Sequence, residues 1–262
     1  MQDSPRIVLA LPAYNESANI DPLFTRIADA RKKVLPNLSV LIYDDGSKDD
    51  TRVRAEGWNG REGLPVRVIG LKENRGLGGA VLGLLRDFAG PEVGGQRDAD
   101  AMALMDCDDT MDPFQIPAMW EKLTKEDLEL IIASRYRSGA TVSGVPAHRR
   151  LMSRGAAVLF SLMHPIPGVR DYSCGFRLYK RSLIDRAWAA WGEQIVVQRG
   201  FASMVEVLLK LGRMKAKAGE VPLCLHYDQK RGESKMPVSD NAKRLFKLMW
   251  QWRKEGLEPP KK

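Results

Sequence analysis

Four carboxylates crowd into residues 105–113, a short stretch with the sequence MDCDDTMDP. They belong to Asp106, Asp108, Asp109 and Asp112. Carboxylates at this density repel one another unless a positive charge lies among them. Oxygen ligands favour a hard divalent cation such as Mg²⁺ or Mn²⁺, which commonly also holds substrate phosphates. The stretch therefore indicates a candidate cation site, and an acidic turn whose aspartates cap the next helix is the alternative interpretation.

The acidic stretch follows one of five apolar runs that alternate with helical patterns in the first half of the chain. The predicted strands are residues 7–11, 40–43, 66–71, 101–105 and 128–133, and the predicted helices between them are residues 19–34, 49–57, 77–88 and 114–123. Strands rich in Val, Ile and Leu without strict alternation indicate a parallel sheet that helices cover on both faces. The predicted fold class is α/β, with a Rossmann-like, mostly parallel central sheet.

Polar segments follow all five predicted strands. They read PAYNE at residues 12–16, DDGS at 44–47, NRGLGG at 74–79, the acidic stretch itself, and SRY at 134–136. Ligands of doubly wound sheets bind beyond the carboxyl ends of the strands. Turn formation or helix capping explains any one segment, but five at one sheet edge together predict a binding site. NRGLGG matches neither the dinucleotide fingerprint nor Walker A, yet its glycines would let a phosphate or sugar approach a helix start.

Composition limits the class of protein. The 262 residues are 44% hydrophobic, enough for one globular domain or one domain with an extension. The formal net charge of +8 suits nucleic acid, anionic lipid or phosphate-bearing ligands. Three scattered cysteines are too few for a disulfide framework or a zinc cluster, which favours a reducing cytoplasm. The longest apolar run, residues 156–163, falls short of the ~20 residues of a membrane span, so we expect any membrane contact to be peripheral.

An ordered series of motifs resembles a known family. PAYNE, DDGS, NRGLG and the DCD of residues 106–108 resemble the family 2 glycosyltransferases with the GT-A fold. The later segments ASRY, RLMSRGA, DYSCGFRLY, EVP and RGESK resemble the dolichol-phosphate mannose synthase branch, which uses polyprenyl phosphates. The resemblance implies an inverting, metal-dependent transfer of a hexose from a nucleotide-diphosphate sugar to a dolichyl or undecaprenyl phosphate. GDP-mannose is the favoured donor and a UDP-sugar the alternative, with Mg²⁺ or Mn²⁺ as cofactor.

The same resemblance assigns roles to residues. It implies that Asp108 is the metal ligand and that Asp106, its catalytic partner, contacts ribose or metal. Asp109 is then expected to support this pair from outside the ligand set, and Asp112 to cap the next helix. The predicted nucleotide-sugar-binding residues are Pro12, Tyr14, Glu16, Tyr43, Asp44, Asp45, Asp106, Cys107, Arg135, Arg231 and Lys235. Cys107 stands where the family often has alanine. Gln229 replaces a family arginine, and Arg231 is the candidate substitute.

The acceptor decides whether the reaction needs a general base. A hydroxyl acceptor must lose a proton to a carboxylate, for which Asp171 is the candidate, whereas a polyprenyl phosphate is already ionised. A basic helix start, Arg149, Arg150, Ser153 and Arg154, suits an acceptor phosphate, and a solvated basic face explains it equally well. A glycan or other hydroxyl acceptor is the main alternative. A non-catalytic nucleic-acid-binding protein explains the charge but not the motifs, so we expect no nucleic-acid partner.

The chain is expected to comprise a GT-A domain, residues 1–236, and a C-terminal amphipathic helix with a tail, residues 237–262. The helix, at residues 241–255, has one apolar face and basic residues on others, which suits a membrane interface or packing on its own domain. We expect a cytoplasmic protein, peripheral on the membrane through this helix or an anchoring partner. Glu206, on a predicted helix over residues 201–211, resembles a family glutamate and is expected in a structural salt bridge.

Overall fold

The computed structural model describes residues 4–90, 98–143, 147–226 and 238–260. Its centre is a seven-stranded sheet in the order β3-β2-β1-β4-β7-β5-β8. The strands are β1 Ile7–Ala13, β2 Leu38–Asp45, β3 Val66–Leu71, β4 Ala101–Leu104, β5 Leu130–Ser134, β7 Arg177–Lys180 and β8 Ala218–Pro222. Only β7 runs antiparallel to its neighbours, β4 and β5. The predicted mostly parallel α/β sheet is confirmed.

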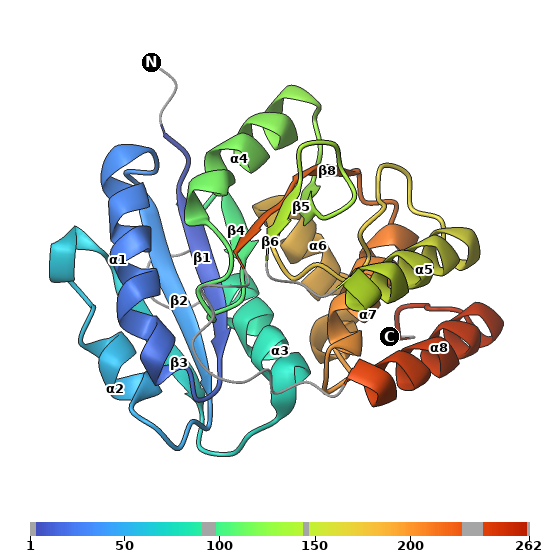
Figure 1. Cartoon of the computed structure of the whole chain (residues 1–262), viewed down its shortest axis with the longest axis horizontal. Helices are drawn as coiled ribbons and strands as arrows, with labels where there is room; N and C mark the ends of the chain where they lie inside the picture. The colour runs from blue at the N-terminus through green and yellow to red at the C-terminus, as the bar shows by residue number, and fades with distance from the viewer. Residues whose placement is uncertain (1–3, 91–97, 144–146, 227–237, 261–262) are drawn as a thin grey trace.

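Helices cover this sheet on both faces (Figure 1). The helices of the described residues are α1 Ser17–Lys33, α2 Thr51–Glu56, α3 Gly76–Ala89, α4 Ile116–Lys125, α5 Ala147–Met163, α6 Arg181–Trp191, α7 Ala202–Arg213 and α8 Val238–Glu255, of which α5 and α8 lie to the side of the sheet. Helix α3 packs against α6 and α7, whereas α1 contacts α2 and the short turn that leads into α4. The central strands therefore have no solvent face. In β1, Ile7 to Leu11 are at most 2% exposed, which explains its unbroken apolar sequence.

The chain reverses its direction across the sheet at β1. It first adds β2 and β3 on one side of β1 and then returns to place β4 on the other side. Such a switch point leaves a crevice outside the carboxyl ends of the two strands that flank it. The segment PAYNE follows β1 and the acidic stretch follows β4. The topology thus brings these two motifs to one crevice.

Three features of the second half lie outside the predicted strand pattern. Strand β8 pairs with β5 at one edge of the sheet, and no predicted strand covers its residues. The four-residue strand β7 inserts between β4 and β5, and α6 follows it directly. A second, two-stranded parallel sheet joins β6, Thr141–Ser143, to β9, Cys224–His226. Strand β7 has only four residues, with the sequence RLYK, and both its first and its last residue are charged. It therefore shows neither the length nor the alternation from which a strand is predicted.

The C-terminal helix α8 packs on α5 and α7 (Figure 1). Met249 and Trp252 are buried in this contact, and Nε2 of His164 lies 3.1 Å from the carbonyl oxygen of Met249. The proposed domain boundary near residue 236 falls outside the described residues and stays a prediction. Within the described part of the chain, no helix combines the length and apolar character that a membrane crossing needs.

Candidate active site

Hydrogen bonds join the loops that follow β1 and β2. The backbone N–H of Asn15 donates to the Ser47 hydroxyl at 2.9 Å, and the Asn15 side chain accepts from the N–H of Lys48 at 2.8 Å. The N–H of Glu16 donates to the hydroxyl of Thr51 at 2.7 Å. Asn15 has a φ of 52°, in the left-handed region that asparagine tolerates better than most residues. The first two polar segments therefore form one connected surface.

The two aspartates after β2 fix neighbouring turns. Asp44 accepts the N–H of Ser47 at 3.1 Å, and Asp45 accepts the N–H of Arg75 at 2.9 Å, at the start of α3. Burial raises the pKa of Asp45, and hydrogen bonds from the backbone N–H groups of Arg75 and Gly76 partly offset this effect. Asp45 thus ties the DDGS segment to the glycine-rich segment. Contact of either aspartate with a nucleotide stays a prediction.

Tyr43 lies beneath α3. Its side chain is only 6% exposed, and a Cβ atom at Gly83 would lie 2.0 Å from the tyrosine ring. Only glycine at position 83 allows this close approach between strand and helix. The Tyr43 ring therefore packs against α3. The predicted contact of Tyr43 with the nucleotide base stays a prediction.

The four carboxylates after β4 separate into two groups. Asp109 has a φ of 62° and lies 3.0 Å from Nη2 of Arg26 on α1. Asp112 accepts the N–H of Phe114 at 3.0 Å and caps the turn that leads into α4, as its position in the sequence predicts. Asp106 and Asp108 are half-buried at the strand end that borders the crevice.

Asp108 is held by its own loop. Its Oδ1 accepts from the N–H of Thr110 at 3.3 Å and from the Thr110 hydroxyl at 2.7 Å. Within the described residues, no three His, Cys, Asp or Glu side chains come together as a complete metal site. Mg²⁺ and similar ions are commonly held by one or two carboxylates together with water and substrate phosphates. The Asp106–Asp108 pair therefore fits a cation that a diphosphate ligand shares, and it does not fit a closed structural site.

Cys107 lies between these two aspartates and is 2% exposed. Burial, together with the negative charges of Glu16 and Asp108, raises the pKa of the Cys107 thiol well above its usual value. The side chain is therefore a neutral thiol at neutral pH, which excludes a thiolate nucleophile at this position.

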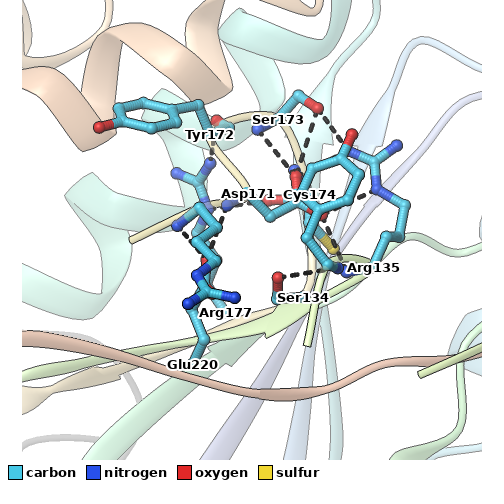
Figure 2. A network of polar contacts seen from close by, with 10 residues as sticks. Ser134, Arg135, Asp171, Tyr172, Ser173, Cys174, Arg177 and Glu220 are labelled. Carbon is cyan, nitrogen blue, oxygen red and sulfur yellow. Dashed lines mark hydrogen bonds and ion pairs between the residues drawn. The ribbon is translucent and has the colours of Figure 1, made fainter. Parts of the chain in front are cut away.

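A loop after α5, residues 171–176, lies against Asp106. A Cβ atom at Gly175 would come within 3.1 Å of Oδ1 of Asp106. The loop is anchored by Asp171, which is completely buried (Figure 2). Asp171 accepts from Nε of Arg135 at 2.8 Å, from Nη2 of Arg135 at 2.7 Å and from the N–H of Cys174 at 3.0 Å. Arg135 is thereby placed beside the loop that borders Asp106.

Glu220 on β8 holds the start of the same loop (Figure 2). One carboxylate oxygen accepts the N–H groups of Arg170 and Asp171, both at 2.6 Å, and the other accepts from Nε of Arg137 at 2.8 Å. The loop backbone is therefore attached to the sheet by a buried side chain.

Arg177, at the start of β7, holds the other side of the loop and is completely buried. Its three donor nitrogens point at backbone carbonyl oxygens, those of Cys174 at 2.8 Å, Tyr172 at 2.9 Å and Met204 at 2.7 Å. Three carbonyl acceptors satisfy the guanidinium without exposing it to water. The loop that borders Asp106 is thus fixed at its start by the carboxylates of Asp171 and Glu220, and its backbone carbonyl groups are held by Arg177.

Residues 9–188 match the profile of Glycosyl transferase family 2. The chain belongs to this family. It is 28% identical over 251 residues to a dolichol-phosphate mannosyltransferase of Pyrococcus furiosus and 28% identical over 250 residues to a dodecaprenyl-phosphate galacturonate synthase of Rhizobium johnstonii. Each alignment covers 94% of this chain but only 64% and 66% of the respective relative, so the chain spans just under two thirds of their lengths.

A solved structure shares the fold. Glucosyl-3-phosphoglycerate synthase from Mycobacterium tuberculosis, in complex with Mn²⁺, uridine diphosphate and glucosyl-3-phosphoglycerate, superposes with a TM-score of 0.61 at 20% identity. The match covers 95% of this chain and 80% of that structure. At this identity the likeness concerns the fold alone, and the expected GT-A fold is confirmed.

Several predicted site residues of this family 2 protein cannot be placed. Arg231 and Lys235 lie outside the described residues, and so do the side chains of Arg149, Arg150 and Ser153. Arg154 is exposed on α5. Strand β9 ends where the N–H of His226 donates to the carbonyl oxygen of Thr110 at 2.8 Å. The described range 147–226 therefore ends beside the acidic stretch, and Arg231 and Lys235 follow it in the sequence.

The structure adds residues that the sequence had not singled out for this site. Gly175, Arg177 and Glu220 belong to quoted motifs, but their spacing reveals neither the contact with Asp106 nor the anchoring of the loop. The structure also changes the interpretation of Asp171, the candidate general base. Burial raises the pKa of Asp171, but the charge and hydrogen bonds of Arg135 outweigh burial and leave the pKa below its usual value. Both of its carboxylate oxygens accept hydrogen bonds from Arg135 or from the loop backbone.

The lowered pKa of Asp171 predicts that its contribution to the free energy of unfolding depends on pH. Because the folded-state pKa of Asp171 lies below its unfolded value of about 3.9, the contribution is present above about pH 4 and is lost as pH falls through the folded pKa. Asp171→Asn should therefore lower the free energy of unfolding more at pH 7 than at pH 3, as measured by urea denaturation. Asp127→Asn, at a 77% exposed side chain, is the control and should change little at either pH. An equal loss at both pH values for Asp171→Asn would contradict this assignment.

Proposed function

We propose that this family 2 glycosyltransferase transfers a hexose, with inversion, from a nucleotide-diphosphate sugar to a polyprenyl phosphate. The observation that carries the proposal is the position of Asp106 and Asp108 at the sheet's switch point, bordered by the loop that Asp171 and Arg135 hold. Both quoted relatives are named for products on long-chain prenyl phosphates, which supports this acceptor class.

The donor reaction requires positive charge at the departing diphosphate. A divalent cation held by Asp106 and Asp108 would neutralise the charge that grows on this group. Mn²⁺ accompanies the nucleotide in the structure that shares the fold, which supports Mn²⁺ or Mg²⁺ here. Arg135 would supply a further positive charge, because about a quarter of its side chain remains exposed after it pairs with Asp171.

The choice of a phosphate as the acceptor is supported by the burial and the hydrogen bonds of Asp171. A hydroxyl acceptor needs a carboxylate to take its proton, and the carboxylate considered for this role is fully buried and bonded to Arg135 and the loop backbone. An ionised phosphate needs no such base. Its oxygen donates the electron pair that forms the new bond to the anomeric carbon. The diphosphate oxygen leaves with the electron pair of the broken bond, and no proton has to be removed. The basic start of α5 would then orient the acceptor phosphate.

The sugar and the base require a direct measurement. Mannose from GDP is favoured by the motif resemblance, but the two relatives carry different sugars, mannose and galacturonate. A thermal-shift panel of GDP, UDP and their sugars, each with and without Mn²⁺, should reveal one donor that raises the melting temperature in a metal-dependent way. If none of these nucleotides stabilises the protein at millimolar concentration, the proposed donor class is wrong.

The acceptor lipid lies in a membrane, and we propose that the face formed by α5 and α8 docks there. The two helices lie side by side (Figure 1), and Arg253 of α8 donates to the carbonyl oxygen of Met163 at the end of α5. Val158 and Leu162, one turn apart on α5, are 59% and 72% exposed, and Trp250 on α8 is 66% exposed. The described basic residues of these helices, Arg154, Lys247, Arg253 and Lys254, are also exposed. Exposed apolar side chains among basic ones suit an anionic membrane interface.

Substitution of one apolar residue tests this docking face. Leu162→Asp should weaken binding to anionic lipid vesicles about tenfold or more, because an apolar side chain contributes about 1.5–3 kcal/mol when it leaves water. Val53→Asp is the matched control, since Val53 is 69% exposed on α2, outside this face. Vesicle flotation measures both. Equal flotation of the two variants would contradict the proposed face.

A further inference from the structure

A groove near Asp45 is lined both by the glycine-rich start of α3 and by a segment that precedes α7. Asn74, Arg75 and Gly78 line one side, and Val197, Gln198 and Arg199 line the other. Asp45 connects this groove to the strand end of β2, because it accepts the N–H of Arg75. The groove therefore opens at the same sheet edge as the candidate active site.

The glycines of this groove allow two backbones to meet. The N–H of Gly78 donates to the carbonyl oxygen of Arg199 at 2.7 Å. A Cβ atom at Gly78 would lie 1.8 Å from the carbonyl oxygen of Gln198, and one at Gly76 would lie 2.6 Å from that of Arg199. The sequence suggested that these glycines make room for a phosphate or sugar. In the structure, Gly76 and Gly78 instead make room for residues 198–199.

A buried ion pair holds residues 197–198 in place. One carboxylate oxygen of Glu206 on α7 accepts the N–H groups of Val197 and Gln198, both at 2.9 Å. The other oxygen lies 2.7 Å from Nζ of Lys210, one turn further along α7, and both side chains are at most 4% exposed. Lys210 also donates to the carbonyl oxygen of Gln194. The expected salt bridge of Glu206 is therefore present, and in addition it binds the backbone of the groove wall.

A buried ion pair is a costly way to stabilise a helix, since desolvation of both charges offsets most of their attraction. The hydrogen bonds to Val197 and Gln198 give this pair a second consequence. They fix the segment that Gly78 contacts, and the start of α3 in turn contacts Asp45. Glu206 is thus connected to Asp45 by three successive contacts, through residues 197–199 and the start of α3, without touching Asp45 itself.

We propose that Glu206 is a positioning residue for the donor site. By holding residues 197–198 against the glycine-rich start of α3, it fixes the groove that receives the nucleoside part of the donor. This inference rests on the proposed function and deepens it, because it assigns part of the donor affinity to a buried ion pair that does not itself reach the donor site.

The test compares loss of the two hydrogen bonds with loss of charge alone. Glu206→Ala should raise the Kd for GDP or UDP with Mn²⁺, measured by calorimetry, and the donor KM about tenfold, with a smaller change in kcat. In the double variant Glu206→Gln/Lys210→Met, the amide oxygen still accepts from the backbone and no charge is left buried. This variant should stay within about threefold of the wild type. Val207→Ala, on the same helix, should lower the melting temperature without changing Kd.

The outcomes separate this inference from the proposed function. If the wild type binds neither diphosphate and transfers no sugar, the proposed function fails. If the wild type binds but Glu206→Ala binds equally well, or if Val207→Ala loses as much affinity, the positioning role is overturned and the function stands. Should Glu206→Ala not fold, Gly78→Ala displaces Gln198 from the opposite side of the groove. An unchanged Kd in that variant also overturns the proposal.

Discussion

Asp108→Asn is expected to abolish sugar transfer, with a loss on the order of 10³-fold in kcat, and to leave the melting temperature nearly unchanged. Asparagine retains the oxygen that accepts from the N–H and hydroxyl of Thr110, so the loop keeps its shape. What it loses is the negative charge that would hold the cation against the departing diphosphate. Transfer of radiolabelled sugar measures the activity, and circular dichroism checks the fold.

Asp112→Asn is the matched control for this prediction. Asp112 lies on the same stretch but caps the N–H of Phe114, a role that asparagine performs equally well. The control should keep wild-type activity. Chelation by EDTA should reproduce the loss in the wild type, and added Mn²⁺ or Mg²⁺ should reverse it. Full activity of Asp108→Asn in the presence of EDTA would exclude the metal assignment.

Arg135→Met is expected to have the second largest effect, on stability and on activity together. Asp171 is completely buried, and Arg135 is its partner at 2.7 Å. Removing one member of a buried pair typically costs about 3–5 kcal/mol, because the other charge is left uncompensated. We therefore expect a fall of this size in the free energy of unfolding at pH 7, measured by urea denaturation, and loss of transfer because the diphosphate loses a positive neighbour.

A second substitution separates these two effects. In Arg135→Met/Asp171→Asn neither charge of this pair remains, and the asparagine oxygen still accepts the N–H of Cys174. The double variant should regain most of the stability and none of the activity. Recovery of both would show that Arg135 serves the fold alone, and recovery of neither would contradict the view that the unpaired carboxylate causes the instability.

The sequence predicted the first half of the fold well because an apolar run marks each strand there, and even the four-residue β4 is buried throughout. The predicted strand at 66–71 coincides with β3. The first predicted strand covers residues 7–11, whereas β1 extends to Ala13 and Pro12 pairs in register with Tyr43. Strand β7 is not predicted from the sequence, because its four residues begin with an arginine and carry no periodic signal.

The candidate site was predictable as a set of motifs but not as a set of contacts. Strand-end position brought PAYNE, DDGS and the acidic stretch to one edge, and the hydrogen bonds of Asn15 and Asp45 join neighbouring segments there. Asp171 and Arg135 are 36 residues apart, and no spacing rule reveals that they pair. The same limit applies to Glu206, whose helical pattern shows its burial but not the backbone N–H groups that it holds.

The most direct test of the central proposal is sugar transfer to a polyprenyl phosphate in lipid vesicles. The protein would be incubated with radiolabelled GDP-mannose, or with a UDP-sugar in a parallel reaction, together with Mn²⁺. We predict a labelled lipid that releases its sugar in mild acid, because a glycosyl phosphate ester is labile under these conditions. A labelled product that resists mild acid would indicate a hydroxyl acceptor and contradict the proposal, as would the absence of transfer from every donor tested.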